Sequence, residues 1–279
     1  MKSFSTKSAQ VEYSLNKKYR KSIWNPFVSA VKKYSLINPG DRIAVCVSGG
    51  KDSLLLAKLM QMLHRYSDFP FEVVNIALDP GYTEINLEKI KTNASLLGLE
   101  LKIFNADIFG FVSTVEKSPC YLCARMRRGY LYEFAAGEGC NKIALGHHLD
   151  DVVETTVMAM FYGAQLQAMP PKLKSTSHPG MQLIRPLFCV SEKDICSWRD
   201  YNGLSFLQCA CRFTEKSEYF ENISKRKEVK LLLGNLEKDN PLIYSNILNS
   251  IHNVCLDTFC GYKSGGVRHG FNEIFDKSE

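Results

Sequence analysis

The feature of this sequence that most constrains its fold is a glycine turn that directly follows an apolar run and directly precedes a helical pattern. The run at 42–47 has the composition of an interior parallel strand, and the apolar spacing at 54–63 predicts a helix. The turn between them reads Ser48-Gly49-Gly50-Lys51-Asp52-Ser53. A glycine pair alone marks only a tight turn, but the whole hexapeptide between a strand and a helix predicts a nucleotide-binding α/β unit.

The residue types of this hexapeptide suit a phosphate chain. Glycines let backbone amides approach phosphate oxygens at a helix N-terminus, and Lys51 adds a full positive charge. Ser48 and Ser53 can donate hydroxyl hydrogen bonds, while Asp52 can either cap the helix or hold Mg²⁺. The spacing differs from that of G-x-x-x-x-G-K-[ST] loops. It resembles the signature of PP-loop ATP pyrophosphatases, which implies attack on the α-phosphate of ATP, an adenylated substrate and release of pyrophosphate.

Strand and helix patterns continue to alternate after this unit. The remaining runs predict strands at 71–79, 99–105 and 142–145, and helices at 84–97, 122–136 and 149–162. This alternation favours an α/β fold with a doubly wound parallel sheet. Residues 169–180 are expected to form a loop, helical patterning resumes at 191–201 and about 215–251, and the glycine-containing tail at 261–266 is expected to be flexible.

We expect three regions along the chain: an N-terminal helical and basic region at 1–38, a nucleotide-binding domain at 39–213, and C-terminal helices with a flexible tail at 214–279. In the first region, Pro26 should bend or divide a helix. The same region carries a run of basic residues, namely Lys17, Lys18, Arg20, Lys21, Lys32 and Lys33. A solvated face and a contact with RNA phosphates both fit this charge run.

A second polar motif, Gly146-His147-His148-Leu149-Asp150-Asp151-Val152-Val153-Glu154, follows the strand predicted at 142–145. Its carboxylates should lie beside the carboxyl edge of the sheet, where ligands bind in open α/β folds. Without the phosphate loop, helix capping and surface charge would be the simpler interpretation. With it, we assign Gly146, Asp151 and Glu154 to nucleotide and Mg²⁺ binding and Asp150, with Lys51 and Asp52, to catalysis. The two histidines are assigned no role as a base.

The chain has 10 cysteines, and their expected role depends on the compartment in which the protein resides. The start of the sequence lacks the apolar core of a signal peptide, and no run approaches the roughly 20 apolar residues of a membrane span, so we expect a cytoplasmic protein without a membrane partner. In a reducing compartment, cysteines serve metal binding, catalysis or burial. Burial is favoured for Cys46, Cys140 and Cys189. The net charge of +6 is compatible with a polyanionic partner but does not require one.

Two close pairs of cysteines remain, Cys120-Tyr121-Leu122-Cys123 and Cys209-Ala210-Cys211. Two thiolates three residues apart at a helix start can bind one metal centre, and a distant third can complete it. On spacing alone, zinc fits at least as well as iron and sulfur. Arg125 and Arg128 follow the first pair, and they either steady phosphate or sulfur charge or face solvent.

Several blocks outside the phosphate loop resemble the tRNA 2-thiocytidine synthetase family. The blocks are Cys120–Arg128, Lys142–Asp151, Met160–Gly163, Met169–Leu173 and Ile184–Leu187, and the similarity extends from about residue 15 to 235. The resemblance implies that ATP and Mg²⁺ serve to adenylate O2 of a cytidine in tRNA, at position 32 of the anticodon loop. A cysteine desulfurase or another sulfide donor would supply the sulfur that displaces AMP.

The resemblance also implies a [4Fe–4S] cluster on three cysteines, with one iron left open to hold hydrosulfide. Cys120 and Cys123 match the family's Cys-x-x-Cys. The family often shows a second Cys-x-x-Cys where this chain has Cys-Ala-Cys. Cys211, before the polar start of a helix, is our first choice for the third ligand, and Cys209 stays open. Arg185, in the Ile-Arg-Pro-Leu block, is assigned to nucleotide binding.

Two other functions compete with thiolation. In the first, zinc occupies the cysteines and another nucleophile, such as an amine, attacks the adenylate. In the second, the chain is a nucleotide-binding RNA module without turnover, against which the intact Lys51, Asp52 and Asp150 argue. The sequence gives neither the tRNA species nor the oligomeric state, and it is compatible with a homodimer. Cys255 and Cys260 are assigned no role.

Overall fold

A computed structural model describes residues 4–112, 119–207 and 225–275 of the chain. It divides into two compact units, Met1–Val229 and Lys230–Glu279. No helix among the described residues is long and apolar enough to cross a membrane.

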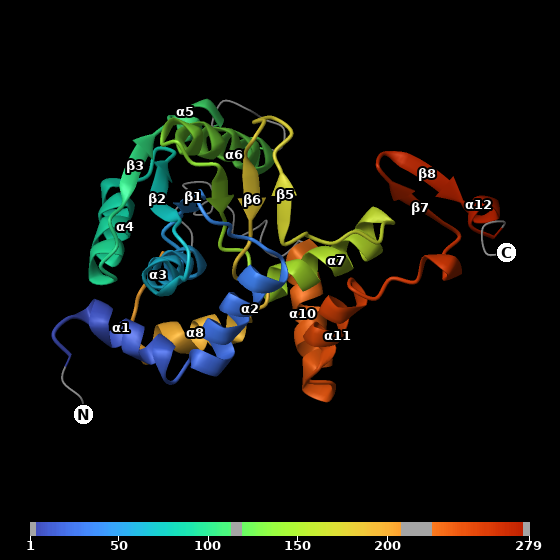
Figure 1. The fold of residues 1–279 in the computed structure, drawn as a ribbon, viewed down its shortest axis with the longest axis horizontal. Helices are drawn as coiled ribbons and strands as arrows, with labels where there is room; N and C mark the ends of the chain where they lie inside the picture. Colours follow the sequence, from blue (N-terminus) through green and yellow to red (C-terminus); the bar gives the residue numbers. More distant parts are fainter. Residues whose placement is uncertain (1–3, 113–118, 208–224, 276–279) are drawn as a thin grey trace. The chain divides into compact units, whose positions relative to one another are not determined.

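The first unit is built on a six-stranded sheet with the order β3-β2-β1-β4-β6-β5 (Figure 1). The strands are β1 Arg42–Cys46, β2 Glu72–Asp79, β3 Lys102–Asn105, β4 Lys142–Ala144, β5 Lys172–Lys174 and β6 Gln182–Ile184. All pairings are parallel except that of β5 with β6 at one edge. The predicted doubly wound sheet is confirmed. The loop expected at 169–180 is corrected, because β5 lies within it, and β6 directly after it was not predicted.

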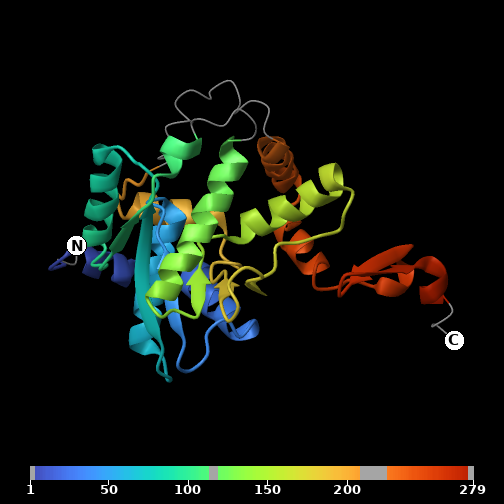
Figure 2. The ribbon, with the colours of Figure 1, turned by 90° about the horizontal axis from the view of Figure 1, so that it is seen from above.

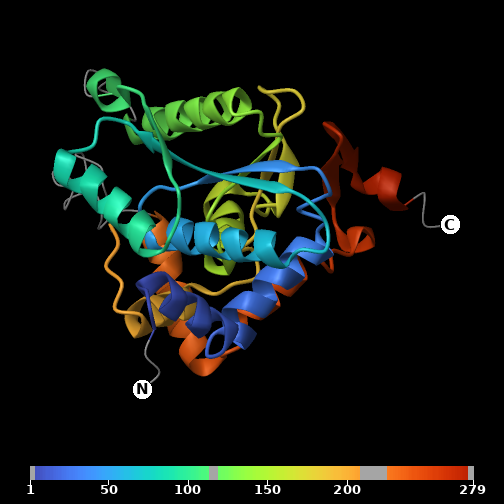
Figure 3. The ribbon, with the colours of Figure 1, turned by 60° about the vertical axis from the view of Figure 1, so that its left-hand side comes forward.

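The helices of this unit are α1 Lys7–Asn16, α2 Asn25–Lys33, α3 Lys51–Tyr66, α4 Glu84–Leu96, α5 Ile108–Val112, α6 Pro119–Gly137, α7 Leu149–Gly163 and α8 Glu192–Tyr201. Of these, α7 extends outward from the sheet (Figure 2). Helices α3 and α6 lie on opposite faces of the sheet (Figure 3). In β1, Ile43 and Val45 pack into the core on the α3 side, whereas Ala44 and Cys46 pack into the core on the α6 side. Burial on both faces explains the uninterrupted apolar run.

The N-terminal region is helical, as predicted, and it is divided near Pro26. A π-helical turn at Arg20–Trp24 separates α1 from α2, and Pro26 lies in the first turn of α2. Leu15, Tyr19, Ile23 and Phe27 are all buried at a spacing of four residues. The six basic residues of the run between Lys17 and Lys33 are exposed. Their proposed contact with RNA stays a prediction.

The second unit contains most of α10 (Lys225–Asp239), together with α11 (Ile243–Ser250), a 3-10 turn at Leu256–Thr258, the strands β7 (Gly261–Ser264) and β8 (Val267–Gly270), and α12 (Phe271–Phe275). The tail that was expected to be flexible is a hairpin instead, in which β7 pairs antiparallel with β8. Gly265 and Gly266 form its turn, and both have positive φ, a conformation that suits a two-residue hairpin loop. Residues 215–224 of the predicted helical stretch lie outside the described residues.

Candidate nucleotide and sulfur-transfer site

The phosphate loop is fixed by its own hydrogen bonds. Ser53 Oγ accepts a hydrogen bond from Ser48 N at 3.1 Å and donates one to Gly50 O at 3.0 Å. Gly49 has a φ of +85°, and a Cβ built there would lie 2.6 Å from Ile90 Cγ1, so only glycine fits. The N-cap of α3 is Gly50, which makes no side-chain cap hydrogen bond. The first amides of α3 are therefore left for an anionic ligand.

Lys51 lies between two carboxylates. Its Nζ is 3.2 Å from Asp52 Oδ2 and 3.0 Å from Glu192 Oε1. Burial works against the charge of Lys51, but Asp52 and Glu192 outweigh it and raise the pKa of the ammonium group. The lysine is therefore a fixed cation at neutral pH. Glu192 begins α8, and the sequence analysis missed it because no local motif connects it with the loop.

The second motif lies directly against the first turn of α3. A Cβ at Gly146 would approach Asp52 C and Ser53 N to 3.0 Å each, so glycine is what allows the two motifs to meet. The His148 ring stands between them: its Nε2 is 3.9 Å from Asp52 Oδ1, and its Nδ1 is 3.7 Å from Asp150 Oδ2. The structure thus brings together the residues expected at the carboxyl ends of β1 and β4.

Two of the expected catalytic carboxylates fit a divalent cation. Asp150 is half-buried, and this partial burial raises its pKa, although Glu192 N donates a hydrogen bond to its Oδ2 at 2.7 Å. Asp52 Oδ1 is buried and has no hydrogen-bond partner among the described residues. No group of three metal-ligating side chains occurs in the described part of the chain. Mg²⁺ commonly needs only one or two carboxylates beside the phosphates of its substrate, so Asp52 and Asp150 suffice.

Asp151 and Glu154 have a partner that the sequence analysis did not foresee. Arg226, in the first turn of α10, places Nη2 2.9 Å from Asp151 Oδ1 and Nε 2.8 Å from Glu154 Oε2. Asp151 also accepts a hydrogen bond from His148 N at 3.0 Å. The charge of these two carboxylates is thus compensated by the guanidinium group of Arg226, whereas Asp52 pairs with Lys51.

Arg185 lies at the carboxyl end of β6, the strand that pairs in parallel with β4 and so ends at the same edge of the sheet as β1 and β4. Its Nη1 donates to Pro170 O at 2.5 Å, and its buried Nε has no hydrogen-bond partner among the described residues. Burial and the nearby Arg128 lower the pKa of Arg185 to about 10, which leaves it charged at neutral pH. Burial lowers the pKa of His147 to about 4, so this ring is neutral.

Of the four candidate cluster ligands, only Cys123 has a described side chain. Its thiol is buried in the first turns of α6, in one cluster with Leu78 at the carboxyl end of β2. Cys120 stands one turn earlier on α6 but its side chain is outside the described part, as are Cys209 and Cys211 entirely. Among the other cysteines, the predicted burial is confirmed for Cys46 and Cys140, and Cys189 is half-buried.

The described residues on either side of the second cysteine pair are both anchored at the nucleotide edge. Leu207 N donates to Gly49 O at 3.2 Å in the phosphate loop. Arg226 binds Asp151 and Glu154 on α7. The described residues nearest to this cysteine pair on both sides therefore lie beside the two motifs. Arg125 and Arg128 are exposed on α6.

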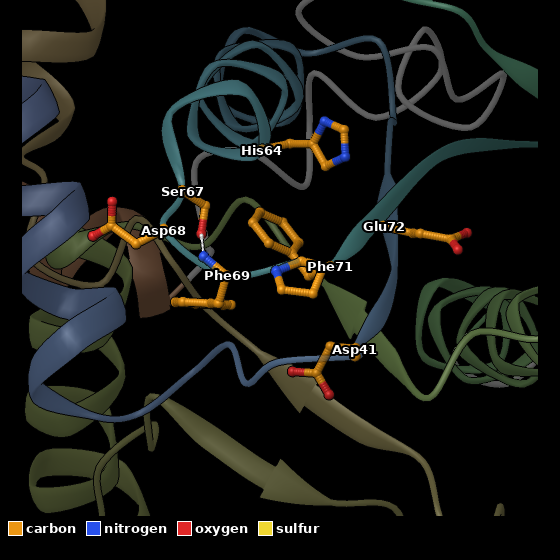
Figure 4. A pocket seen from close by; sticks show the side chains of 9 residues that line it. Asp41, His64, Ser67, Asp68, Phe69, Phe71 and Glu72 are labelled. Carbon is orange, nitrogen blue, oxygen red and sulfur yellow. Dashed lines mark hydrogen bonds between the residues drawn. The ribbon is translucent and has the colours of Figure 1, made fainter.

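Figure 4 shows a hollow at the opposite edge of the sheet, between the end of α3 and the starts of β1 and β2. Asp41, which lines it, accepts a hydrogen bond from the buried Lys142 Nζ at 2.6 Å. Ligands of open parallel sheets bind at the carboxyl ends of the strands, so we assign no role to this hollow.

Comparisons with known proteins agree with this geometry. A model of the PP-loop domain family matches residues 15–226. The tRNA-cytidine(32) 2-sulfurtransferase of Geobacter metallireducens is 35% identical over 247 residues, which cover 88% of this chain and 93% of that protein. Its namesake from Hahella chejuensis is 35% identical over 264 residues, 92% of this chain and 89% of the relative.

Among solved structures, the U34-tRNA thiolase NcsA from Methanococcus maripaludis with its [4Fe–4S] cluster has the same fold. The TM-score is 0.62 at 22% sequence identity, and the match covers 82% of this chain and 77% of that one.

Proposed function

This chain belongs to the PP-loop ATP pyrophosphatases and, within them, to the tRNA-cytidine(32) 2-sulfurtransferase family, and we propose that it adenylates a tRNA cytidine and replaces its O2 with sulfur. The target is position 32 of the anticodon loop. The observation that carries the proposal is that the neighbouring parallel strands β1, β4 and β6 end at one edge of the sheet and are followed there by the phosphate loop with Lys51 and Asp52, by Asp150, and by Arg185. The activity after which the relatives are named supports the choice of substrate.

The chain's own groups account for the adenylation step. The amides at the start of α3 and the ammonium of Lys51 bind the phosphates of ATP, and Lys51 stabilises the charge that develops on the leaving pyrophosphate. Asp52 and Asp150 hold Mg²⁺, which satisfies the orphaned Asp52 Oδ1. The Nε of Arg185 is available to a phosphate oxygen. His147, neutral at pH 7, adds no charge.

Glu192 and Arg226 complete this arrangement without touching the phosphates. Glu192 holds Lys51 through its carboxylate and Asp150 through its backbone N–H. Arg226 holds Asp151 and Glu154, so α7 keeps its first turn against α3. We propose that both are positioning residues.

For sulfur transfer, we propose that Cys120, Cys123 and Cys211 hold a [4Fe–4S] cluster, with Cys209 as the alternative third ligand. The buried thiol of Cys123 lies at the end of β2, which is next to β1, and this position beside the phosphate loop supports the assignment. Leu207 and Arg226, on either side of the Cys209/Cys211 pair in the sequence, both bond to residues at the nucleotide edge, which supports the choice of a third ligand from this pair. When bound, the cluster supplies an iron that carries sulfide.

The test is thiolation in vitro. The protein, purified without oxygen, is incubated with tRNA, ATP, Mg²⁺ and sulfide, and the tRNA is analysed by nucleoside mass spectrometry and mapped by nuclease digestion. We expect 2-thiocytidine at position 32 together with AMP and pyrophosphate. The proposal would be contradicted if the protein held zinc and formed AMP and pyrophosphate together with a different modified nucleoside. That result would favour attack on the adenylate by another nucleophile.

A further inference from the structure

The far end of α7 carries exposed apolar side chains that the nucleotide site does not use. Met160, Phe161, Tyr162 and Leu166 are 44%, 57%, 43% and 64% exposed. The first three belong to the Met160–Gly163 block, and the helix ends there with Ala164 in the left-handed conformation. Single exposed apolar residues need no explanation, but a contiguous group marks an interaction site.

The two aromatic rings of this group are held in a defined arrangement. Tyr162 Oη donates to Glu228 Oε2 at 2.6 Å, and Lys225 Nζ lies 4.8 Å from the centroid of the Tyr162 ring. The Phe161 ring stands at 72° to the Tyr162 ring, with 6.5 Å between centroids. Tyr162 is thus fixed from the start of α10 with Lys225 beside its ring, and the neighbouring Phe161 is exposed to solvent.

We propose that the rings of Phe161 and Tyr162 form a stacking site for an unpaired base of an RNA loop, with Lys225 beside the adjoining phosphate. The inference rests on the proposed function, in which the substrate is tRNA. Proteins read single-stranded loops by stacking splayed bases on aromatic rings, with cations tracking the backbone. A second copy of this chain would suit the apolar groups but not the lysine, because lysine is depleted in protein interfaces.

The segment that carries these rings, 150–170, begins and ends near the nucleotide edge. From Asp150 to Phe161, α7 rises roughly 16 Å at about 1.5 Å per residue. Beyond the helix, the chain returns to Pro170, whose carbonyl accepts the hydrogen bond from Arg185 Nη1. This separation is too large for the base under modification, so the stacked base is a neighbour of it in the same loop.

Binding of a fluorescently labelled anticodon stem-loop to the full chain tests the site. Phe161→Ala and Phe161→Leu should weaken binding about 5- to 100-fold, whereas Phe161→Trp, which keeps a ring for stacking, should bind like the wild type. Tyr66→Ala is the matched control, since Tyr66 is 58% exposed at the end of α3, and it should bind like the wild type. A fully paired RNA of equal length should bind all five proteins equally.

Three outcomes would overturn the inference. The first is that Phe161→Leu binds the stem-loop as tightly as the wild type, and the second is that Phe161→Ala weakens binding of the paired RNA equally. The third is a change in the molar mass of the RNA-free protein on Phe161→Ala, which would identify a self-association surface. The thiolation assay on the wild type separates this test from the proposed function. If the wild type binds and thiolates tRNA while Phe161→Ala binds as well, only the stacking site falls. If the wild type binds no tRNA, both proposals fall.

Discussion

The phosphate loop and the cysteine site are assembled in different ways. The loop comes from one hexapeptide in which the Ser53 hydroxyl bonds to the loop's own backbone, and glycine is required at position 49, where Ile90 approaches. The proposed cluster ligands come from two distant places in the chain, and among them only Cys123 has a described side chain. A local motif can thus define adenylation, whereas sulfur transfer depends on the fold as a whole. Substitutions should separate the two activities.

The largest effect is expected at the cysteines. Cys120→Ser or Cys123→Ser should abolish both the bound iron and thiolation, while pyrophosphate release with tRNA and ATP persists, because the phosphate loop is built from other elements. Replacing Cys209 and Cys211 singly should separate them, with one variant losing the cluster. Iron and sulfide analysis after anaerobic reconstitution is the measurement, and Cys260→Ser is the control.

The ligand assignment would be wrong if all four single variants kept a full cluster. Wild-type protein that bound only zinc would contradict the sulfur-transfer chemistry itself.

The reverse separation is expected at Lys51. Lys51→Ala removes the fixed cation between Asp52 and Glu192, and it should lower pyrophosphate release about 100- to 1000-fold while the iron content stays that of the wild type. Lys193→Ala, an exposed lysine on α8, is the matched control. Unchanged release by a folded Lys51→Ala protein would show that the loop does not bind the reacting phosphates.

A smaller effect is expected at Arg226, which connects the start of α10 with the first turns of α7. Arg226→Ala removes the guanidinium from Asp151 and from Glu154, whose side chain is 5% exposed. The free energy of unfolding should fall by about 1–3 kcal/mol, less than for a fully buried pair because the Arg226 side chain is itself 44% exposed. Adding Glu154→Gln should restore part of the loss in denaturant titrations. Lys227→Ala should change nothing, and an equal loss there would remove Arg226 from its role.

The last effect concerns pH; it is small near neutrality and grows as the pH falls. The pKa of His147 is about 4 in the folded chain because of burial, against an ordinary value of 6.5. Between these values the unfolded state binds a proton that the folded state does not, so stability decreases as the pH falls from 6.5 towards 4, by up to about 1.4 kcal/mol per pH unit. His147→Asn should flatten this slope in urea titrations at several pH values. An unchanged slope would mean that His147 is protonated in the folded state.

The sequence allowed the phosphate loop, the core strands and most helices to be predicted, because each produces a signal within its own residues. Ile43–Cys46 in β1 is apolar throughout since it is covered on both faces. The strands at Lys172–Lys174 and Gln182–Ile184 are too short for a detectable period. Glu192 and Arg226 gain their roles from partners far away in the chain, so no local pattern identifies them.

The most direct test of the account follows the oxygen atom that leaves the base. If O2 of the cytidine attacks the α-phosphate, pyrophosphate departs and sulfide then displaces AMP, so AMP carries the oxygen from the base. A tRNA transcribed with ¹⁸O at cytidine O2 is thiolated in a single turnover, and the AMP is analysed by mass spectrometry. The account predicts one ¹⁸O in AMP for each 2-thiocytidine formed. Unlabelled AMP accompanying 2-thiocytidine would contradict activation of the base by adenylation.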